Sequence, residues 1–300
     1  MMDWTDRHQR YFARLLSNEA LLYTEMITTG AILFGDEQRH LQFNQEEHPV
    51  ALQLGGSTPA DLSKCTKIAQ RWGYDEVNLN VGCPSDRVQN NMIGACLMGH
   101  ATLVKDCLTA MREACDIPVT VKHRIGIDDL DSAQFLTDFV GEVQESGCET
   151  FIVHARIAIL QGLSPKENRE VPPLNYERVY ELKKTFPELE ILINGGIKTI
   201  AECKAHLRHV DGVMLGREAY SNPWLISEVD TELYGKSPRD FCRQDTIRAL
   251  YPYIESELLK GQKLSYITRH ILGIFHGQPG GKQFRRFLSE NAHKPGAGTD

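Results

Sequence analysis

Short apolar runs recur along the chain, and each is followed by a more polar segment. They occupy residues 21–27, 49–54, 76–81, 119–123, 150–155, 189–195 and 211–216. Nearly all the segments between them have a helix-like pattern that opens with Ser, Thr or Asp and closes with Gly, as in residues 57–73 and 131–147. Strand and helix alternating at intervals of roughly 25 to 40 residues predict βαβ units and a parallel sheet.

The number of strands indicates the fold class. A TIM (β/α)8 barrel has eight strands, and the pattern supplies seven, so we expect a barrel whose first strand would precede Met1. After Trp224 the strand rhythm stops, and residues 237–261, 264–277 and 282–293 have helical patterns. We therefore predict a barrel domain over residues 1–236 and an all-helical domain over residues 237–300.

Composition narrows the class of protein. With 41% hydrophobic and 24% charged residues the composition is typical of a globular protein. The chain has no apolar run of about 18 residues, and residues 1–12 lack the apolar stretch of a signal peptide, so we expect neither a membrane span nor secretion. We expect a cytoplasmic protein without a membrane span. The 8 cysteines are scattered without CxxC pairs or zinc-ligand spacing, so we expect reduced thiols and no metal site.

Charge is distributed unevenly. The chain carries a net charge of -7, but residues 237–300 hold ten Lys/Arg against six Asp/Glu, a net of +4, which leaves -11 for residues 1–236. Lys282, Arg285 and Arg286 have i, i+3 and i+4 spacing and would share one helix face. The asymmetry suggests a polyanionic partner, although charge alone fits an ordinary solvated helical surface equally well.

Polar residues stand where the predicted strands end. They are Gln53, Asn80, Cys83, Lys122, Arg124, His154, Asn194, Gly195, Gly196, Gly216 and Arg217. Each has an ordinary structural explanation by itself, but the carboxyl ends of barrel strands form the active site in this fold. The glycines would let backbone N–H groups approach a phosphate, with Arg217 adding charge, and Lys122 could face a ring that becomes anionic on reduction. This pattern describes a cradle for flavin mononucleotide (FMN).

Several longer motifs resemble one family. The stretches MMDWTDRH, LNVGCPSDRVQ, GACLM, VTVKHRIGID, GLSPKENREVPPL, ILINGGI and VMLGREAYSNPW resemble the tRNA-dihydrouridine synthases, and SPKENRE resembles their A subfamily. The resemblance covers essentially the whole chain. It departs from the usual pattern at Ile157 and Ile159, where the family usually has a lysine and an aromatic residue.

The resemblance implies an activity and a set of site residues. It implies an FMN-bound barrel that, with a helical C-terminal domain, binds tRNA and reduces uridines 20 and 20a of the D-loop with electrons from NADPH. FMN would contact Met1, Met2, Gln53, Lys122, His154, Asn194, Gly195, Gly196, Gly216 and Arg217. Asn80 would contact the substrate base, and Cys83 would be the catalytic proton donor.

The chemistry of uracil explains why a thiol would stand there. Hydride added at C6 leaves negative charge at C5 that needs a proton, and a thiol with the usual pKa of about 8.5 stays mostly protonated at neutral pH. Arg124 is a further candidate for contact with the tRNA substrate, and the long loop of residues 155–171 would be a second clamp through Lys166 and Arg169. The oligomeric state expected is a monomer.

Two other functions stay open. The first is a flavin-dependent reductase of a free pyrimidine, in the manner of dihydroorotate dehydrogenase, against which the basic C-terminal segment and the long loop count. The second is a catalytically silent tRNA-binding protein, which the missing first strand makes plausible. A flavin spectrum followed by a dihydrouridine assay on unmodified tRNA separates all three.

Overall fold

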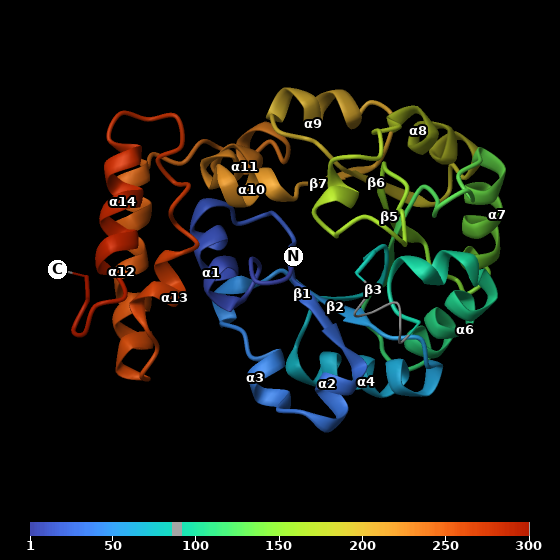
Figure 1. The fold of residues 1–300 in the computed structure, drawn as a ribbon, viewed down its shortest axis with the longest axis horizontal. Helices are drawn as coiled ribbons and strands as arrows, with labels where there is room; N and C mark the ends of the chain where they lie inside the picture. The colour runs from blue at the N-terminus through green and yellow to red at the C-terminus, as the bar shows by residue number, and fades with distance from the viewer. Residues whose placement is uncertain (86–91, 300) are drawn as a thin grey trace.

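The computed structural model describes residues 1–85 and 92–299. All seven predicted runs form strands of one parallel sheet, with neighbours in the order β1 to β7. The strands are β1 Leu22–Thr28, β2 Val50–Gly55, β3 Glu76–Val81, β4 Val119–Arg124, β5 Thr150–His154, β6 Glu190–Asn194 and β7 Gly212–Met214. The sheet curls on itself and helices surround it, which makes the fold a TIM-like barrel (Figure 1). Within the described residues β1 and β7 are the two edges of the sheet.

Helices follow most strands, and several of their ends carry the expected capping residues. The α-helices are α1 Arg7–Leu16, α2 Thr29–Phe34, α3 Glu37–Leu41, α4 Pro59–Trp72, α6 Ala101–Arg112, α7 Ala133–Gln144, α8 Tyr176–Thr185, α9 Ile200–His206, α10 Arg217–Ser221, α11 Val229–Glu232, α12 Arg243–Leu259, α13 Leu264–Thr268 and α14 Gly281–Asn291. Short 3-10 helices are η1 Gln45–Glu47, η2 Ala95–Gly99, η3 Glu167–Arg169 and η4 Pro223–Glu228. Asp6 caps α1 by accepting from the N–H groups of His8 and Gln9, and Gly73 ends α4 with φ of 88°.

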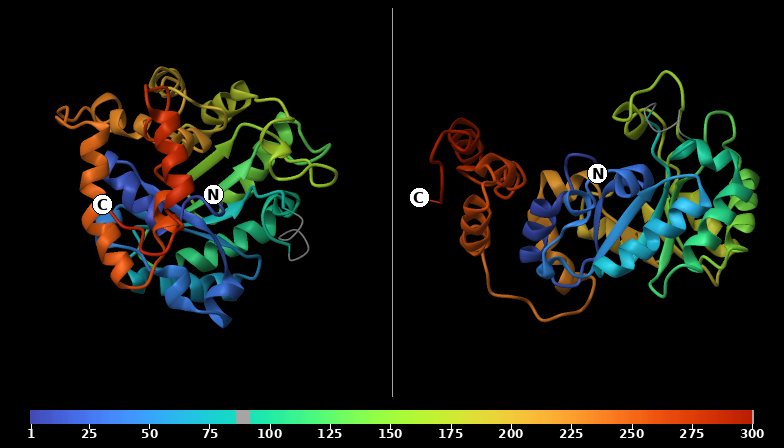
Figure 2. Two further views of the ribbon diagram at one scale, coloured as in Figure 1. Left: turned by 60° about the vertical axis from the view of Figure 1, so that its left-hand side comes forward. Right: turned by 90° about the horizontal axis from the view of Figure 1, so that it is seen from below.

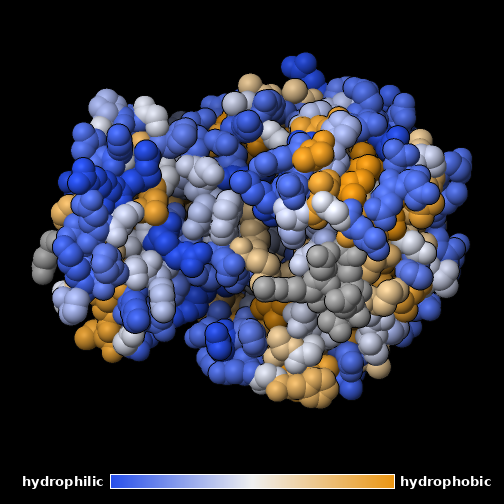
Figure 3. Space-filling view, viewed as in Figure 1, coloured by the Kyte–Doolittle hydropathy of each residue, from blue (hydrophilic) through white to orange (hydrophobic). Residues whose placement is uncertain are grey.

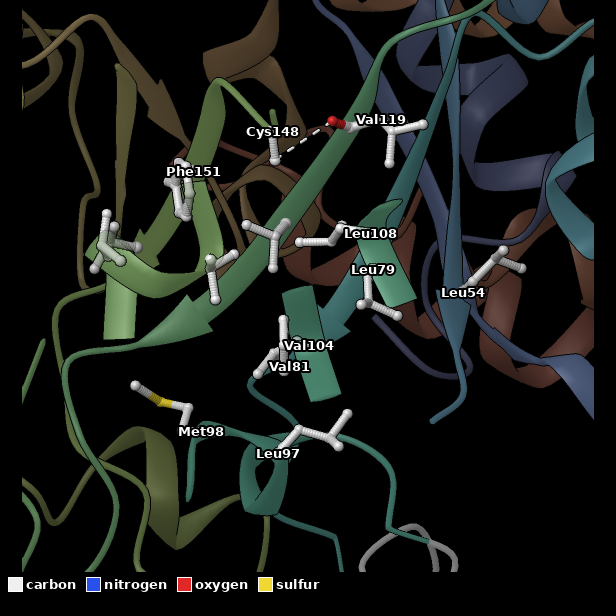
Figure 4. Close-up of a cluster of buried hydrophobic side chains, with 14 of the residues drawn as sticks. Leu54, Leu79, Val81, Leu97, Met98, Val104, Leu108, Val119, Cys148 and Phe151 are labelled. Carbon is white, nitrogen blue, oxygen red and sulfur yellow. Dashed lines mark hydrogen bonds between the residues drawn. The ribbon is translucent and has the colours of Figure 1, made fainter. Parts of the chain in front are cut away.

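The main hydrophobic core lies between the sheet and the surrounding helices. Leu79 and Val81 of β3 pack with Val104 and Leu108 of α6 among fully buried neighbours (Figure 4). The thiol of Cys148 is buried in the same core and donates a weak hydrogen bond of 3.5 Å to the carbonyl of Val119. These contacts hold the strands so that their carboxyl ends lie at one edge.

A second core joins the C-terminal helices to the start of the chain. Helices α12, α13 and α14 lie to one side of the barrel, after a linker that follows α11 (Figure 2). Leu250 and Ile254 of α12 pack with Phe12 and Leu16 of α1. The division at residue 236 stays a prediction, and the structure adds that α1 packs against the helices at the other end of the sequence.

One predicted helix is shorter than its pattern. Residues 264–277 were expected to be helical, but α13 ends at Thr268 and a succession of turns follows. Gly273 lies among these turns, and a Cβ there would lie 2.4 Å from the carbonyl oxygen of Ser221, so only glycine fits at this position. Among the helices described, none is both long enough and apolar enough to cross a membrane.

Candidate active site at the carboxyl ends of the strands

The strand register brings the predicted site residues to one edge of the sheet. Asn80 of β3 pairs with Lys122 of β4, and His154 of β5 pairs with both Arg124 of β4 and Asn194 of β6. Because parallel strands end at the same edge, these polar groups lie side by side. Residues that are up to 114 positions apart, from Asn80 to Asn194, therefore form one site.

Lys122 lies within this edge. Its ammonium group donates to Asn194 Oδ1 at 3.1 Å, and the Asn194 amide donates to the carbonyl of Met214 at 2.8 Å. Burial lowers the pKa of Lys122 to about 7, and the neighbouring Arg124 guanidinium contributes to the lowering. Burial thus disfavours the charged amine, and an anion placed beside it would favour the charged form.

His154 is neutral in this environment. Burial first, and then the positive charges of Arg124, Lys122, Arg156 and Arg217, hold its pKa well below the ordinary value. A neutral imidazole can donate from one ring nitrogen and accept at the other. His154 therefore adds a hydrogen-bonding group to the site without adding charge.

The loop after β6 brings its backbone close to His154. Gly195 has φ of 124° and Gly196 has φ of 72°, values that favour glycine. A Cβ at Gly195 would lie 2.8 Å from His154 Cδ2, and the Gly195 carbonyl accepts from the Tyr176 hydroxyl at 2.7 Å. Only a residue without a side chain fits between the strand end and this imidazole.

Cys83 is held by backbone contacts on either side of it. Asn80 Oδ1 accepts from the N–H groups of Gly82 at 3.0 Å and Cys83 at 2.9 Å, and the Cys83 carbonyl accepts from Ala95 N–H at 2.8 Å. Cys83 itself is partly exposed. Its side chain lies close enough to Lys122 to be among the groups that influence that lysine's pKa. The predicted proton donor and the predicted flavin contact therefore lie in one site.

Arg124 occupies an internal position. It is 2% exposed, and its guanidinium donates to the carbonyls of Gly82 at 3.1 Å, Ile157 at 3.0 Å and Asn168 at 2.9 Å. These bonds tie the Cys83 loop to the long loop after β5. They favour a positioning role over the predicted direct contact with the substrate, and that contact stays a prediction.

The long loop after β5 is organised by Asn168, which the sequence did not single out. Its side chain is fully buried, accepts from Ile159 N–H at 2.7 Å and donates to the Ile159 carbonyl at 2.9 Å. Lys166 is exposed on this loop, and Arg169 is partly exposed with its carbonyl bound by Arg217 at 3.0 Å. Ile157 and Ile159, the two departures from the family pattern, thus supply backbone contacts within the loop.

The remaining predicted residues lie farther from this edge or at its border. Met2 is 58% exposed, and the Met1 amino group donates to Thr5 Oγ1 at 2.6 Å. Lys282, Arg285 and Arg286 are exposed on α14, where Arg286 pairs with Glu290 at 2.7 Å. Figure 3 shows mainly hydrophilic residues on the C-terminal helices at the left of the view.

The donor set fits an anionic ligand. Lys122, Arg124, Arg156, Arg169 and Arg217 surround His154 and Cys83, as their mutual effects on pKa show. Among the described residues, one carboxylate forms an ion pair with this group, that of Glu170 with Arg217 at 2.8 Å. Such an excess of positive charge favours a phosphate group or an anionic ring.

Comparison with known proteins identifies the family. The family model described as dihydrouridine synthase (Dus) matches residues 1–299. The chain belongs to the dihydrouridine synthase family. Dihydrouridine synthases are flavin-dependent oxidoreductases, which agrees with the cationic strand-end site of this chain.

Curated relatives in the dihydrouridine synthase family cover nearly the whole chain. A tRNA-dihydrouridine(20/20a) synthase of Escherichia coli (strain K12) is 63% identical over 298 residues, which are 99% of this chain and 86% of the relative. The protein of the same name from Yersinia pestis is 64% identical over 300 residues, covering 100% and 87% of the two chains. That from Vibrio parahaemolyticus serotype O3:K6 (strain RIMD 2210633) is 61% identical over 301 residues, covering 100% and 92%.

A polar face inside the barrel of this dihydrouridine synthase was not predicted from the sequence. Glu76, Asn78 and Asn80 alternate with apolar residues along β3, and all three are buried. Alternation in a strand places such residues on one face. The alternate spacing of these three polar residues in the sequence indicates a hydrogen-bonded network on the interior face of β3, next to the site.

Proposed function

We propose that this protein reduces the C5=C6 bond of uridines 20 and 20a in tRNA, with bound FMN and with NADPH as the source of electrons. One observation carries the proposal: Cys83 and Lys122 share a cationic site at the carboxyl ends of the strands. Relatives named tRNA-dihydrouridine(20/20a) synthase at 63% identity support the substrate. A tRNA substrate also implies a cytoplasmic protein, and we expect it to act as a monomer.

The residues at the strand ends fit FMN. Lys122 and His154 would border the isoalloxazine ring, and Arg217 with the glycines after β6 and β7 would bind the phosphate. The full set is Met1, Met2, Gln53, Lys122, His154, Asn194, Gly195, Gly196, Gly216 and Arg217. These residues would hold a flavin whose chemistry, once NADPH has reduced it, would be the transfer of hydride to C6 of the uracil ring.

Cys83 is proposed to protonate C5. The negative charge left at C5 is conjugated to the C4 carbonyl, and a thiol is a strong enough acid to neutralise it. Asn80 fixes the backbone N–H groups of Gly82 and Cys83, so the loop that carries the thiol has a defined position. In addition, Asn80 is the expected contact to the uracil base.

Two positively charged surfaces are proposed to bind the tRNA backbone. The first consists of Lys282, Arg285 and Arg286 on α14, and the second of Lys166 and Arg169 on the loop after β5, with Arg124 beneath it. The target base must leave its stack to reach the site, at a cost of a few kcal/mol. Phosphate contacts at these two surfaces would offset that cost.

The direct test uses protein reconstituted with FMN, NADPH and a tRNA transcript that lacks modification. We expect dihydrouridine at positions 20 and 20a, oxidation of an equal amount of NADPH, and no product from a matched transcript with cytidine at both positions. Reduction of free uracil or dihydroorotate chemistry, with tRNA untouched, would favour a free-pyrimidine reductase. Tight tRNA binding without flavin uptake would indicate the silent RNA-binding protein.

A further inference from the structure

A chain of hydrogen bonds runs through the barrel interior and ends beneath Cys83. Its middle members come from three adjacent strands. Thr120 of β4 accepts from the Asn78 amide at 2.8 Å, Asn78 Oδ1 accepts from Gln53 Nε2 at 2.9 Å, and Gln53 Oε1 accepts from Asn80 Nδ2 at 2.8 Å. All four side chains belong to residues at most 9% exposed.

At both ends of this hydrogen-bond chain the donor and the acceptor are fixed. At the lower end, Glu76 Oε1 accepts from the Thr120 hydroxyl at 2.6 Å and from the Tyr23 hydroxyl at 2.5 Å. At the upper end, Asn80 Oδ1 accepts from the backbone N–H groups of Gly82 and Cys83, which can only donate. A carboxylate oxygen and two backbone donors thus set the direction of every bond between them.

The direction determines how each amide is turned. Because the Thr120 hydroxyl gives its one hydrogen to Glu76, its oxygen must accept, so the Asn78 nitrogen faces it. The Asn78 oxygen then faces Gln53, and the Gln53 oxygen faces Asn80. A reversed amide at any point would set donor against donor or acceptor against acceptor in a buried site, which is unfavourable because neither group could reach water instead.

We propose that Asn78 and Thr120 are positioning residues for the Cys83 loop. Neither lies at the strand-end surface: Asn78 is fully buried and Thr120 is 2% exposed. They act through Gln53 and Asn80, the expected contacts of flavin and uracil, so the inference rests on the proposed function. An amide offers two N–H groups and two lone pairs, so Gln53 keeps capacity for a ligand while it is held by this chain.

Thr120 could also contribute only to the stability of the barrel. Any buried hydroxyl removed from a barrel could lower stability, and lower activity would follow without any effect on orientation. Thr66 offers a matched control, because it too is fully buried, and its hydroxyl has no hydrogen-bond partner within the described part of the chain. Thr66→Val therefore removes a buried hydroxyl outside the chain of hydrogen bonds.

The experiment compares Thr120→Val, Thr120→Ser and Thr66→Val. Two quantities are measured on FMN-reconstituted protein: hydrogen exchange of the Gly82 and Cys83 amides, and kcat and KM for dihydrouridine formation in tRNA. Thr120→Val removes two hydrogen bonds, the one to Glu76 and the one from Asn78. We therefore expect at least about tenfold faster exchange and at least about tenfold lower kcat, with KM for tRNA unchanged. Thr120→Ser keeps the hydroxyl and should restore both, and Thr66→Val should leave both at the wild-type level.

The outcomes distinguish this inference from the proposed function. Wild-type exchange at Gly82 and Cys83 in Thr120→Val would overturn the positioning role, whatever the activity. Faster exchange of equal size in Thr66→Val would overturn it as well, because the effect would then be one of general stability. If the wild-type protein makes no dihydrouridine, the proposed function fails, while faster exchange in Thr120→Val alone still supports the hydrogen-bond chain.

Discussion

Cys83 and Lys122 show how position changes what a side chain can do. Both are ordinary in the sequence, and each could be a structural residue alone. In the structure Lys122 is placed among positive charges, and burial lowers its pKa to about 7. Cys83 lies on a loop held by Asn80 and Ala95, with its thiol near that lysine.

Cys83→Ala tests the proton donor. We expect the variant to bind FMN and tRNA and to accept electrons from NADPH, but to form dihydrouridine about 10² to 10⁴ times more slowly, the usual contribution of general acid catalysis. Single-turnover reduction of unmodified tRNA by the pre-reduced enzyme measures this step. Cys115→Ser, which changes a thiol after α6, is the matched control and should keep the wild-type rate. A normal rate in Cys83→Ala would make the thiol structural and leave His154 or Lys122 as candidate acids.

The lowered pKa of Lys122 predicts that flavin binding depends on pH. An anionic ligand favours the charged amine, so its pKa should rise from about 7 when FMN binds. The protonated form then binds better, and affinity should be greatest below pH 7 and fall as pH rises from 7 towards the raised pKa in the complex. Titration calorimetry in buffers of different ionisation enthalpy should detect proton uptake near pH 7.5, about half a proton or more by the linkage relation.

Lys122→Met provides the control for that titration. The variant should bind FMN more weakly and should lose the part of the proton uptake that belongs to the amine. Uptake unchanged from wild type would assign the proton to another group and contradict the lowered pKa of Lys122 in the free protein.

The turns at the strand ends determine how closely backbone can approach a ligand. The loop after β6 is the clearest case, because Gly195 and Gly196 both have positive φ and Gly195 lies against the His154 ring. A turn of this kind is recognisable in the sequence as a Gly-Gly pair after an apolar run. Its contact with His154 depends on the pairing of β5 with β6.

Gly195→Ala and Gly73→Ala separate backbone strain from local crowding. Both glycines have positive φ, so backbone strain in each variant should lower the free energy of unfolding by about 1–2 kcal/mol, and crowding should add to that loss in Gly195→Ala. The new methyl would lie 2.8 Å from His154 Cδ2 in Gly195→Ala, but no heavy atom lies within 4 Å of it in Gly73→Ala. Only Gly195→Ala should therefore weaken FMN binding, measured by flavin fluorescence. Equal FMN affinity in the two variants would exclude this loop from the flavin site.

The molecule combines an acidic barrel with a basic helical segment. Residues 1–236 carry a net charge of -11 and residues 237–300 a net of +4, so we expect attraction to tRNA phosphates to be concentrated on the C-terminal helices. The ion pair of Arg7 on α1 with Glu257 on α12 helps to hold these helices against the start of the chain. The two parts can then contribute to one substrate site.

The double variant Lys282→Glu/Arg286→Glu tests the C-terminal surface. We expect weaker tRNA binding and unchanged reduction of the flavin by NADPH. The slope of log K against log salt should fall by about one for each phosphate that the variant no longer neutralises. Lys67→Glu on the barrel helix α4 is the control, since Lys67 is also exposed. Unaltered tRNA affinity and salt slope in the double variant would mean that α14 is a solvated helix without a role in binding.

The local pattern of apolar and polar residues was sufficient to predict the strands and the polar groups at their ends. An apolar run such as residues 76–81, followed by turn residues, predicts a strand by itself. The alternation of faces and the glycine turn depend only on neighbouring residues. The parallel order followed from the helices between the runs. The close approach of Gly273 to Ser221 could not be predicted in this way, because it involves residues 52 positions apart.

Contacts between distant segments determined the rest. Arg124 is buried by contacts with other segments, and α1 packs against α12 at the other end of the sequence. The hydrogen-bond chain from Glu76 to Cys83 passes through Thr120 and Gln53, so no short stretch of sequence contains all its members. The residue types that the chemistry needs could be recognised in the sequence, because charge, acidity and the tendency to form turns are properties of individual residues. Which polar groups became buried, which way each amide turned and how far each pKa moved depended on the partners that folding placed beside them.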